Sequence, residues 1–135
     1  MPWTKEQQQV IEERGCSLLV SAAAGSGKTA VLVERIIEKI SSKEEPVDVD
    51  RLLVVTYTHA AANEMKERIR RAIEKKVEED PENEHLIRQL SLIHKAQITT
   101  IHSFCLNLIR DYYYKLDLDP NFAIGDQGQM DLMKL

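Results

Sequence analysis

The segment with the clearest chemical potential reads Ala22-Ala23-Ala24-Gly25-Ser26-Gly27-Lys28-Thr29. It fits the Walker A pattern, except that Ala22 stands where that pattern has its first glycine. Small residues let backbone N–H groups surround phosphate oxygens, and the dipole of a following helix attracts the same anion. We expect Lys28 to reach the β- and γ-phosphates of ATP and the Thr29 hydroxyl to complete the coordination of Mg²⁺. The alternative is a glycine-rich turn that binds nothing, which leaves the adjacent lysine and hydroxyl unexplained.

Gln7 is a second candidate for nucleotide binding. Its amide group could donate to a ring nitrogen of adenine and accept from the exocyclic amine, the pairing that glutamine makes with this base in DNA recognition. Thr4, three residues earlier, offers a different explanation, because a threonine and a glutamine at this spacing form a capping box at a helix start. Trp3 is equally open between packing and lining a base pocket.

Two polar clusters follow expected strands, and both could contact DNA. The first cluster is Tyr57, Thr58 and His59, and the second is His102 and Ser103. Each comes just after an expected strand. Open parallel sheets bind ligands at the carboxyl ends of their strands, where hydroxyl and imidazole groups can hold phosphates and a tyrosine can stack on a base. Alternatively, the hydroxyl groups cap the helices that follow. For the basic residues nearby we favour a solvated face with ion pairs: Lys66, Arg68, Arg70 and Arg71.

The acidic half of an ATPase site is harder to find. A Walker B element needs an apolar strand that ends in an acidic residue. Only Phe122-Ala123-Ile124-Gly125-Asp126 imitates it, and this segment is short and lacks a second acid. The sequence therefore predicts a chain that binds ATP but does not hydrolyse it efficiently alone.

Apolar periodicity places these residues on alternating strands and helices. We expect strands at 17–22, 51–57 and 97–101, with a short one at 122–124, and the first two in a βαβ unit. Helices are expected at 4–13, after Lys28, from 60 to about 79, around Leu86 to Ile93 and around Leu108 to Leu116. This order is typical of a parallel α/β sheet flanked by helices.

Composition bounds the protein class. The 135 residues can form one ordinary domain core, carry a net charge of −4, and contain no apolar run that could span a membrane. No secretion signal is present, so we expect a soluble, cytoplasmic protein. Cys16 and Cys105 lack metal-ligand spacing and are expected to be reduced and buried.

Four blocks together make the chain resemble the amino-terminal segment of superfamily 1 DNA helicases of the UvrD/RecB type. Trp3-Thr4-x-x-Gln7 resembles the Q motif, and S-A-A-A-G-S-G-K-T at 21–29 resembles motif I. V-V-T-Y-T-H-A-A-A-N-E-M-K-E-R-I at 54–69 resembles motif Ia, and I-T-T-I-H-S-F-C at 98–105 resembles motif Ib. The resemblance implies a RecA-like P-loop NTPase fold, incomplete and limited to the amino-terminal part of motor domain 1A.

Further features are most similar to one branch of this family, the helicase and nuclease subunits of AddAB complexes. These are the A-A-A form of the P-loop, H-A-A-A-N-E-M at 59–65, and L-D-L-D-P-N-F at 116–122. This resemblance implies an ATP-driven 3′-to-5′ motor that acts on DNA ends in double-strand break repair with a second, AddB-like subunit. It also implies a fragment, because the Walker B motif and arginine fingers of the family lie further along the chain.

The same resemblance implies roles for individual residues. Gln7 would contact adenine, Lys28 and Thr29 would contact the phosphates and Mg²⁺, and five residues would contact single-stranded DNA: Tyr57, Thr58, His59, His102 and Ser103. Alternatives are a UvrD/PcrA-like repair helicase without a nuclease, a P-loop small-molecule kinase, and a non-enzymatic ATP-binding regulatory module.

Overall fold

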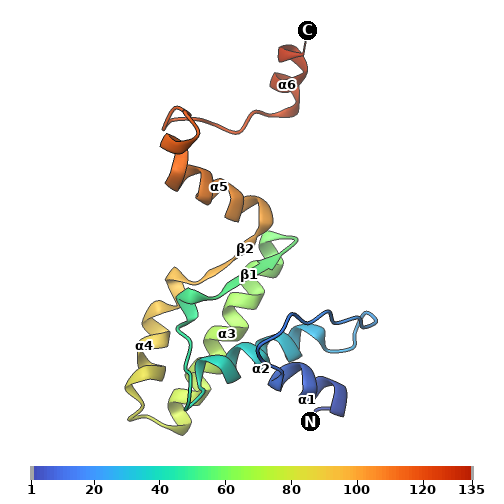
Figure 1. Cartoon of the computed structure of the whole chain (residues 1–135), viewed down its shortest axis with the longest axis vertical. Coiled ribbons are helices and arrows are strands. Elements are labelled where there is room, and N and C mark those ends of the chain that lie inside the picture. The colour runs from blue at the N-terminus through green and yellow to red at the C-terminus, as the bar shows by residue number, and fades with distance from the viewer. Residues whose placement is uncertain (1, 135) are drawn as a thin grey trace. The chain divides into compact units, whose positions relative to one another are not determined.

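The computed structural model describes residues 2–134, which divide into two compact units, one ending at Ile101 and the other beginning at His102 (Figure 1). The first unit contains helices α1 (Lys5–Glu12), α2 (Lys28–Ile40), α3 (His59–Glu79) and α4 (Glu84–Leu92). Short 3-10 turns η1 (Val49–Arg51) and η2 (Ile93–Lys95) precede strands β1 (Leu53–Thr56) and β2 (Gln97–Thr100). The four helices expected in this unit are therefore present, with two of the three strands expected in it.

The two strands form a small parallel sheet, and α3 and α4 make the crossover between them. Leu53 pairs with Gln97 at one end, and Thr56 pairs with Thr100 at the other. Val54, Ile98 and Thr100 are buried, whereas Leu53 and Val55 on the opposite face are about half exposed. Side chains alternate between the two faces of a strand, so this pattern shows that one face of the sheet is covered and the other is open.

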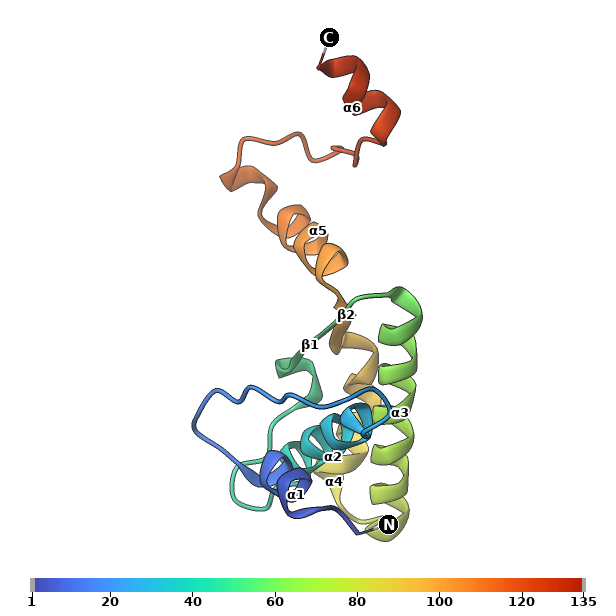
Figure 2. The same ribbon diagram turned by 90° about the vertical axis from the view of Figure 1, so that its right-hand side faces the viewer.

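A single apolar cluster joins α2, α3, α4 and the sheet. Met65, Ile69 and Ile73 supply one buried side chain per turn of α3, the spacing that the sequence predicts for this helix. They pack with residues of the other elements: Ile36, Ile37, Ile40, Val49, Val54, Leu86, Ile93, Ala96 and Ile98. Figure 2 shows α3 running past α2, with α1 beside α2. Burial of each large side chain contributes roughly 1.5 to 3 kcal/mol, so this cluster positions the ends of the strands and of α2.

The exposed face of α3 carries ion pairs, as the sequence interpretation favours. Arg68 contacts Glu64 at 2.7 Å, and Arg70 and Arg71 contact Glu67 at 2.8 and 2.9 Å. Hydrogen bonds from Arg70 and Arg71 lower the pKa of Glu67 to about 2. The charges of these arginines are thus largely balanced within the helix itself.

A polar network that no sequence pattern indicates joins α4 to the start of η1. Gln89 is fully buried; its Oε1 accepts from the backbone N–H of Val49 at 2.8 Å, and its Nε2 donates to the Asp48 carboxylate at 2.8 Å. Arg88 donates to both carboxylate oxygens of Asp48 at 2.6 and 2.5 Å. A ring nitrogen of His85 lies 2.8 Å from the carbonyl oxygen of Ile40 at the end of α2. The network fixes the chain just before β1.

The Asp48 carboxylate should make the stability of the fold depend on pH in the acid range. The hydrogen bond from Arg88, followed by that from Gln89, lowers the pKa of Asp48 in the folded protein below its ordinary 3.8. A group whose folded pKa is lowered stabilises the fold above its unfolded pKa and loses that contribution as pH falls through the folded value. We expect the free energy of unfolding to be nearly constant at neutral pH and to fall as the pH drops below the ordinary Asp48 pKa of 3.8, towards the lowered folded value. Urea denaturation followed by circular dichroism would measure this, and Asp48→Asn should flatten the profile while Glu82→Gln, at an exposed site, should not.

The predicted strand at 17–22 is wrong. The segment has no regular secondary structure, and Leu19 is fully exposed. A strand persists only where its N–H and C=O groups pair with a neighbouring strand, and in residues 2–134 the two strands pair with each other. The βαβ unit predicted for the first half is therefore not formed, and the parallel pair is instead β1 with β2. The short strand predicted at 122–124 is also wrong, because these residues have no regular structure.

Helix α5 spans Ile101–Tyr112, and all of it except Ile101 belongs to the second unit. This unit also contains the 3-10 turn η3 (Tyr113–Lys115) and helix α6 (Gln127–Met133). Asp126 is the acidic residue of the Walker B-like segment 122–126, and it caps α6. Its carboxylate accepts from the N–H of Gln129 at 2.8 Å in a capping box. A structural role therefore accounts for this residue.

The two cysteines are free thiols, as expected, but both are exposed, so the prediction of burial is wrong. Cys16 lies in the unpaired stretch after α1, and Cys105 lies on α5, which has no buried residue. Burial depends on what packs against these segments, which their composition does not reveal.

None of the helices in residues 2–134 combines the length and apolar character needed to cross a membrane.

Candidate nucleotide-binding site

The predicted P-loop forms a tight turn into α2. Gly25 and Gly27 have φ angles of 78° and 80°, in the left-handed region that glycine adopts without strain. The N–H of Ser26 donates to the carbonyl oxygen of Ala23 at 3.2 Å, and Gly27 caps α2, which begins at Lys28. The first N–H groups of a helix have no partner within it, so Lys28 and Thr29 begin the helix where an anion would be attracted.

Lys28 turns back over this loop. Its ammonium group donates to the carbonyl oxygens of Ala22 at 2.5 Å and Ala23 at 3.2 Å. Both bonds are exposed to solvent, and the phosphate oxygens of a nucleotide could replace the two carbonyl oxygens as acceptors. Without a bound nucleotide, the Lys28 side chain, the one charged side chain of the loop, therefore lies over the loop's own backbone.

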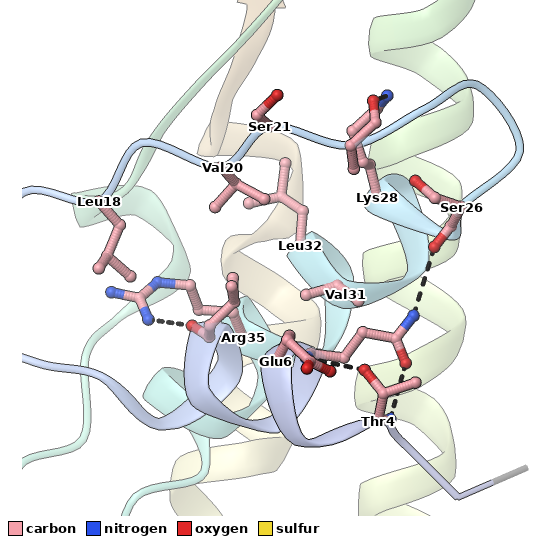
Figure 3. A pocket seen from close by; sticks show the side chains of 13 residues that line it. Thr4, Glu6, Leu18, Val20, Ser21, Ser26, Lys28, Val31, Leu32 and Arg35 are labelled. Carbon is pink, nitrogen blue, oxygen red and sulfur yellow. Dashed lines mark hydrogen bonds between the residues drawn. The ribbon is translucent and has the colours of Figure 1, made fainter.

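Gln7 forms the expected helix cap and contacts the P-loop as well. Thr4 Oγ1 accepts from the N–H of Gln7 at 3.2 Å, and Gln7 Oε1 accepts from the N–H of Thr4 at 2.9 Å, which completes the predicted capping box of α1. The same side chain uses Nε2 to donate to the carbonyl oxygen of Ser26 at 3.3 Å (Figure 3). One amide group thus links the start of α1 to the P-loop. Contact between Gln7 and adenine remains a prediction.

A cavity of about 590 Å³ lies beside the loop, between α1, α2 and the extended segment that follows α1. Gln7, Ser26 and Lys28 form polar parts of its lining. Apolar side chains from three segments line much of the rest: Val10, Leu18, Val20, Val31 and Leu32. Figure 3 shows Val20 on the extended segment opposite Leu32 on α2. Trp3 is about one-third exposed and lies outside this lining. The cavity therefore offers polar groups beside the P-loop and an apolar wall along α2.

Arg35 also lines this cavity, and sequence reasoning missed it. Its guanidinium group donates to the backbone carbonyl of Val10 and so ties α2 to α1. The signal that could have found it is a basic residue between Leu32 and Ile36, within the apolar stripe of α2.

The candidate DNA contacts of the first unit lie at the carboxyl end of β1, as predicted. Tyr57 is almost fully exposed at 99%. Thr58 caps α3, with Oγ1 accepting from the N–H of Ala61 at 3.1 Å, so the capping alternative is confirmed for this hydroxyl. His59 is the exposed first residue of α3. Because Thr56 pairs with Thr100, the carboxyl ends of the two strands lie side by side.

The remaining candidates, His102 and Ser103, lie in the first turn of α5, in the second unit. His102 is exposed and Ser103 is partly buried. A DNA-binding role for any of these five residues stays a prediction.

Comparison with known proteins gives a consistent result. Residues 3–134 match the family described as UvrD/REP helicase N-terminal domain. The chain is 62% identical over 132 residues to the A subunit of the ATP-dependent helicase/nuclease of Clostridioides difficile (strain 630), a match that covers 98% of this chain and 10% of that protein. Similar relatives of the same name come from Clostridium novyi (strain NT), at 63%, and Anoxybacillus flavithermus (strain DSM 21510 / WK1), at 62%, each with 98% of this chain and 11% of the relative covered. The chain thus spans about a tenth of the length of these relatives.

Proposed function

The chain belongs to the UvrD/REP helicase N-terminal domain family, and from this premise we propose that it forms the ATP-binding part of a RecA-like motor domain in a DNA helicase. The P-loop carries the proposal: two glycines at positive φ place Lys28 and Thr29 at the start of α2. The parallel pairing of β1 and β2, with helices in the crossover, supports the fold assignment. The relatives' shared name, which describes an ATP-dependent helicase/nuclease, supports nucleotide use.

In the proposed site, residues of this chain bind and orient the triphosphate. The N–H groups of residues 25–29 would surround the β-phosphate, and the Lys28 ammonium group would exchange the carbonyl oxygens of Ala22 and Ala23 for phosphate oxygens. The Thr29 hydroxyl would hold Mg²⁺ together with phosphate oxygens and water, because this ion usually keeps several waters. When bound, Mg²⁺ neutralises charge on the phosphates.

Efficient hydrolysis would need an acidic residue that neither β1 nor β2 supplies. Strands β1 and β2 end in Thr56 and Thr100, not in the acidic residue that a Walker B strand supplies. We therefore propose that the chain binds ATP and turns it over slowly or not at all by itself.

For the complete enzyme we propose an ATP-driven helicase that moves 3′ to 5′ on single-stranded DNA. The 60% to 63% identity to A subunits of ATP-dependent helicase/nucleases favours the branch that combines this motor with a nuclease and a second subunit, processing DNA ends in break repair. A UvrD/PcrA-like helicase without a nuclease is the nearest alternative.

Calorimetric titration with ATP and Mg²⁺, followed by hydrolysis assays with and without single-stranded DNA, tests the proposal. Binding with little turnover is the expected result. Transfer of phosphate to a small acceptor would contradict the helicase assignment in favour of a kinase, and failure to bind ATP would contradict the site itself.

Gln7→Ala should reduce the preference for ATP over GTP. If the amide pairs with adenine, its loss should reduce discrimination between the bases by about 1 to 3 kcal/mol, measured by calorimetry with both nucleotides. Because Gln7 also completes a capping box, the matched control is Gln129→Ala, which removes the same kind of cap from α6. An unchanged ATP-to-GTP ratio would assign Gln7 to helix capping and P-loop support alone.

Tyr57→Ala should weaken binding to single-stranded DNA by about 1 to 3 kcal/mol if the ring stacks on a base. Fluorescence anisotropy with labelled oligothymidylate would measure the effect. Tyr57→Phe keeps the ring and should retain affinity, and Tyr114→Ala removes another exposed tyrosine from the second unit. Equal losses in the two alanine variants would argue against a specific stacking role for Tyr57.

A further inference from the structure

Helix α1 is short, and few of its side chains are buried against the rest of the first unit. Of its eight residues, Lys5–Glu12, Ile11 alone is buried. Isolated helices shorter than about 12 to 15 residues are marginal in water, so contacts with other elements must hold α1 in place. Gln7 lies on this helix, and the same contacts therefore decide where its amide group stands relative to the P-loop.

Hydrogen bonds tie α1 both to the P-loop and to α2. Gln7 Nε2 donates to the carbonyl oxygen of Ser26 at 3.3 Å, in a bond that is exposed to solvent. Further along α1, the carbonyl oxygen of Val10 accepts from the Arg35 guanidinium group in a partly buried contact. The last four carbonyl groups of a helix have no partner within it, so Arg35 caps the carboxyl end of α1 from a neighbouring helix.

Arg35 lies on the same stripe of α2 as Lys28. Leu32 stands four positions after Lys28, and Arg35 three positions after Leu32, which is the spacing of one helix face (Figure 3). All three line the cavity of about 590 Å³, and so do Gln7 and Val10 of α1. A helix held only beside the P-loop could pivot there, and a second bond about two turns further along α2 removes that freedom.

The carboxyl end of α1 also explains why two cations lie near each other. Arg14 donates to the carbonyl oxygens of Ile11 and Glu13 at 2.6 and 3.0 Å, and Arg35 donates to Val10. The dipole of a helix favours positive charge at this end. Burial, followed by the charge of Arg14, lowers the pKa of Arg35, so its place is held against an unfavourable surrounding. The end of α1, and not a separate anion, accounts for this arrangement.

We propose that Arg35 is a positioning residue for nucleotide recognition: its bond to Val10 holds α1 so that the Gln7 amide stays beside the P-loop. The inference rests on the proposed ATP function and extends it to a residue outside the P-loop. Loss of the bond lets α1 move while Lys28 and Thr29 remain at the start of α2. Selectivity for the base therefore falls, and binding of the phosphates is kept.

Calorimetric titration with ATP and GTP tests this with Arg35→Met, which keeps the apolar stem of the side chain and removes its donors. The ATP-to-GTP affinity ratio should fall about fivefold, the effect of one hydrogen bond. Gln7→Ala added to this variant should lower the ratio little further, because the two residues act through one contact. Arg35→Lys restores a charged donor and should keep most of the preference for ATP.

The matched control is Lys39→Met, which removes a basic side chain of α2 that does not line this cavity. It should leave the ATP-to-GTP ratio unchanged. Circular dichroism would check that each variant is folded. Arg35→Gln, which has a shorter side chain, takes the place of Arg35→Met if the methionine variant does not fold.

Trp3 reports on the tether without any nucleotide. It is the single tryptophan of the chain, and it directly precedes Thr4, the residue that caps α1. Time-resolved fluorescence anisotropy should show wider motion of Trp3 in Arg35→Met than in the unsubstituted chain, in Arg35→Lys or in Lys39→Met.

Separate results would overturn separate parts of the proposal. Unchanged motion of Trp3 in Arg35→Met would overturn the tether, whether or not ATP binds. An ATP-to-GTP ratio that either Arg35→Met or Gln7→Ala leaves unchanged would overturn the positioning role. Losses from these two substitutions that simply add would also overturn it, in favour of a direct contact between Arg35 and the nucleotide. Failure of the unsubstituted chain to bind ATP would instead contradict the proposed function, and the nucleotide role of Arg35 with it.

Discussion

Lys28→Ala is expected to weaken ATP binding by about 2 to 3 kcal/mol, or roughly 30- to 150-fold, because hydrogen bonds to charged groups contribute about this much. The loop loses the charged side chain that lies over it, and no other lysine or arginine occurs in residues 21–29. Isothermal titration calorimetry with ATP and Mg²⁺ would measure the loss. An ATP affinity that does not change would refute the assignment of the P-loop.

The structure predicts that this variant folds normally. The two carbonyl oxygens that Lys28 contacts are exposed, so water can replace the ammonium group as donor. The melting temperature should therefore stay near that of the unsubstituted chain. Lys43→Ala, in the exposed stretch after α2, is the matched control and should change neither stability nor ATP affinity.

Gln89→Leu is expected to destabilise the fold by about 2 to 4 kcal/mol, since it leaves a buried donor without a partner. The N–H of Val49 would lose its acceptor, and Asp48 would lose one of its donors. Small domains have a total stability of only about 5 to 15 kcal/mol, so the loss would be a large fraction of it. Urea denaturation followed by circular dichroism would measure the change.

The comparison for this variant is Gln9→Leu, an exposed position of α1 where the same substitution removes no hydrogen bond found in the structure. That variant should change stability by less than about 0.5 kcal/mol. Equal effects of the two substitutions would mean that the Asp48–Gln89 network adds nothing to stability. Gln89→Glu should also destabilise, because it places a second carboxylate against Asp48.

Features governed by short stretches of sequence are predicted well. The capping box of Thr4 and Gln7, the apolar stripe of Met65, Ile69 and Ile73, and the ion pairs of α3 all depend on residues three or four positions apart. The turn of the P-loop is equally predictable, because its glycines and lysine act within one turn and one helix start. Local spacing is enough for such features.

Features that depend on distant partners are missed or predicted wrongly. The apolar run Leu18-Leu19-Val20 satisfies every local criterion for a strand, but the structure places no strand beside it. The contact from Gln7 to Ser26 spans 19 positions, and that from Gln89 to Val49 spans 40, so no periodic pattern could indicate either. Exposure of Cys105 likewise depends on what surrounds α5, not on its sequence.

The unpaired stretch between α1 and α2 has a practical consequence. A protease must draw several residues of extended backbone into its cleft, and helices and paired strands resist this. Here a fully exposed leucine, Leu19, stands in an extended segment that leads straight into the P-loop. Thermolysin, which cuts beside such residues, would divide the chain between α1 and the loop. The rate of that cut, with and without nucleotide, would report whether the adjacent P-loop is occupied, and the measurement needs no label and no turnover.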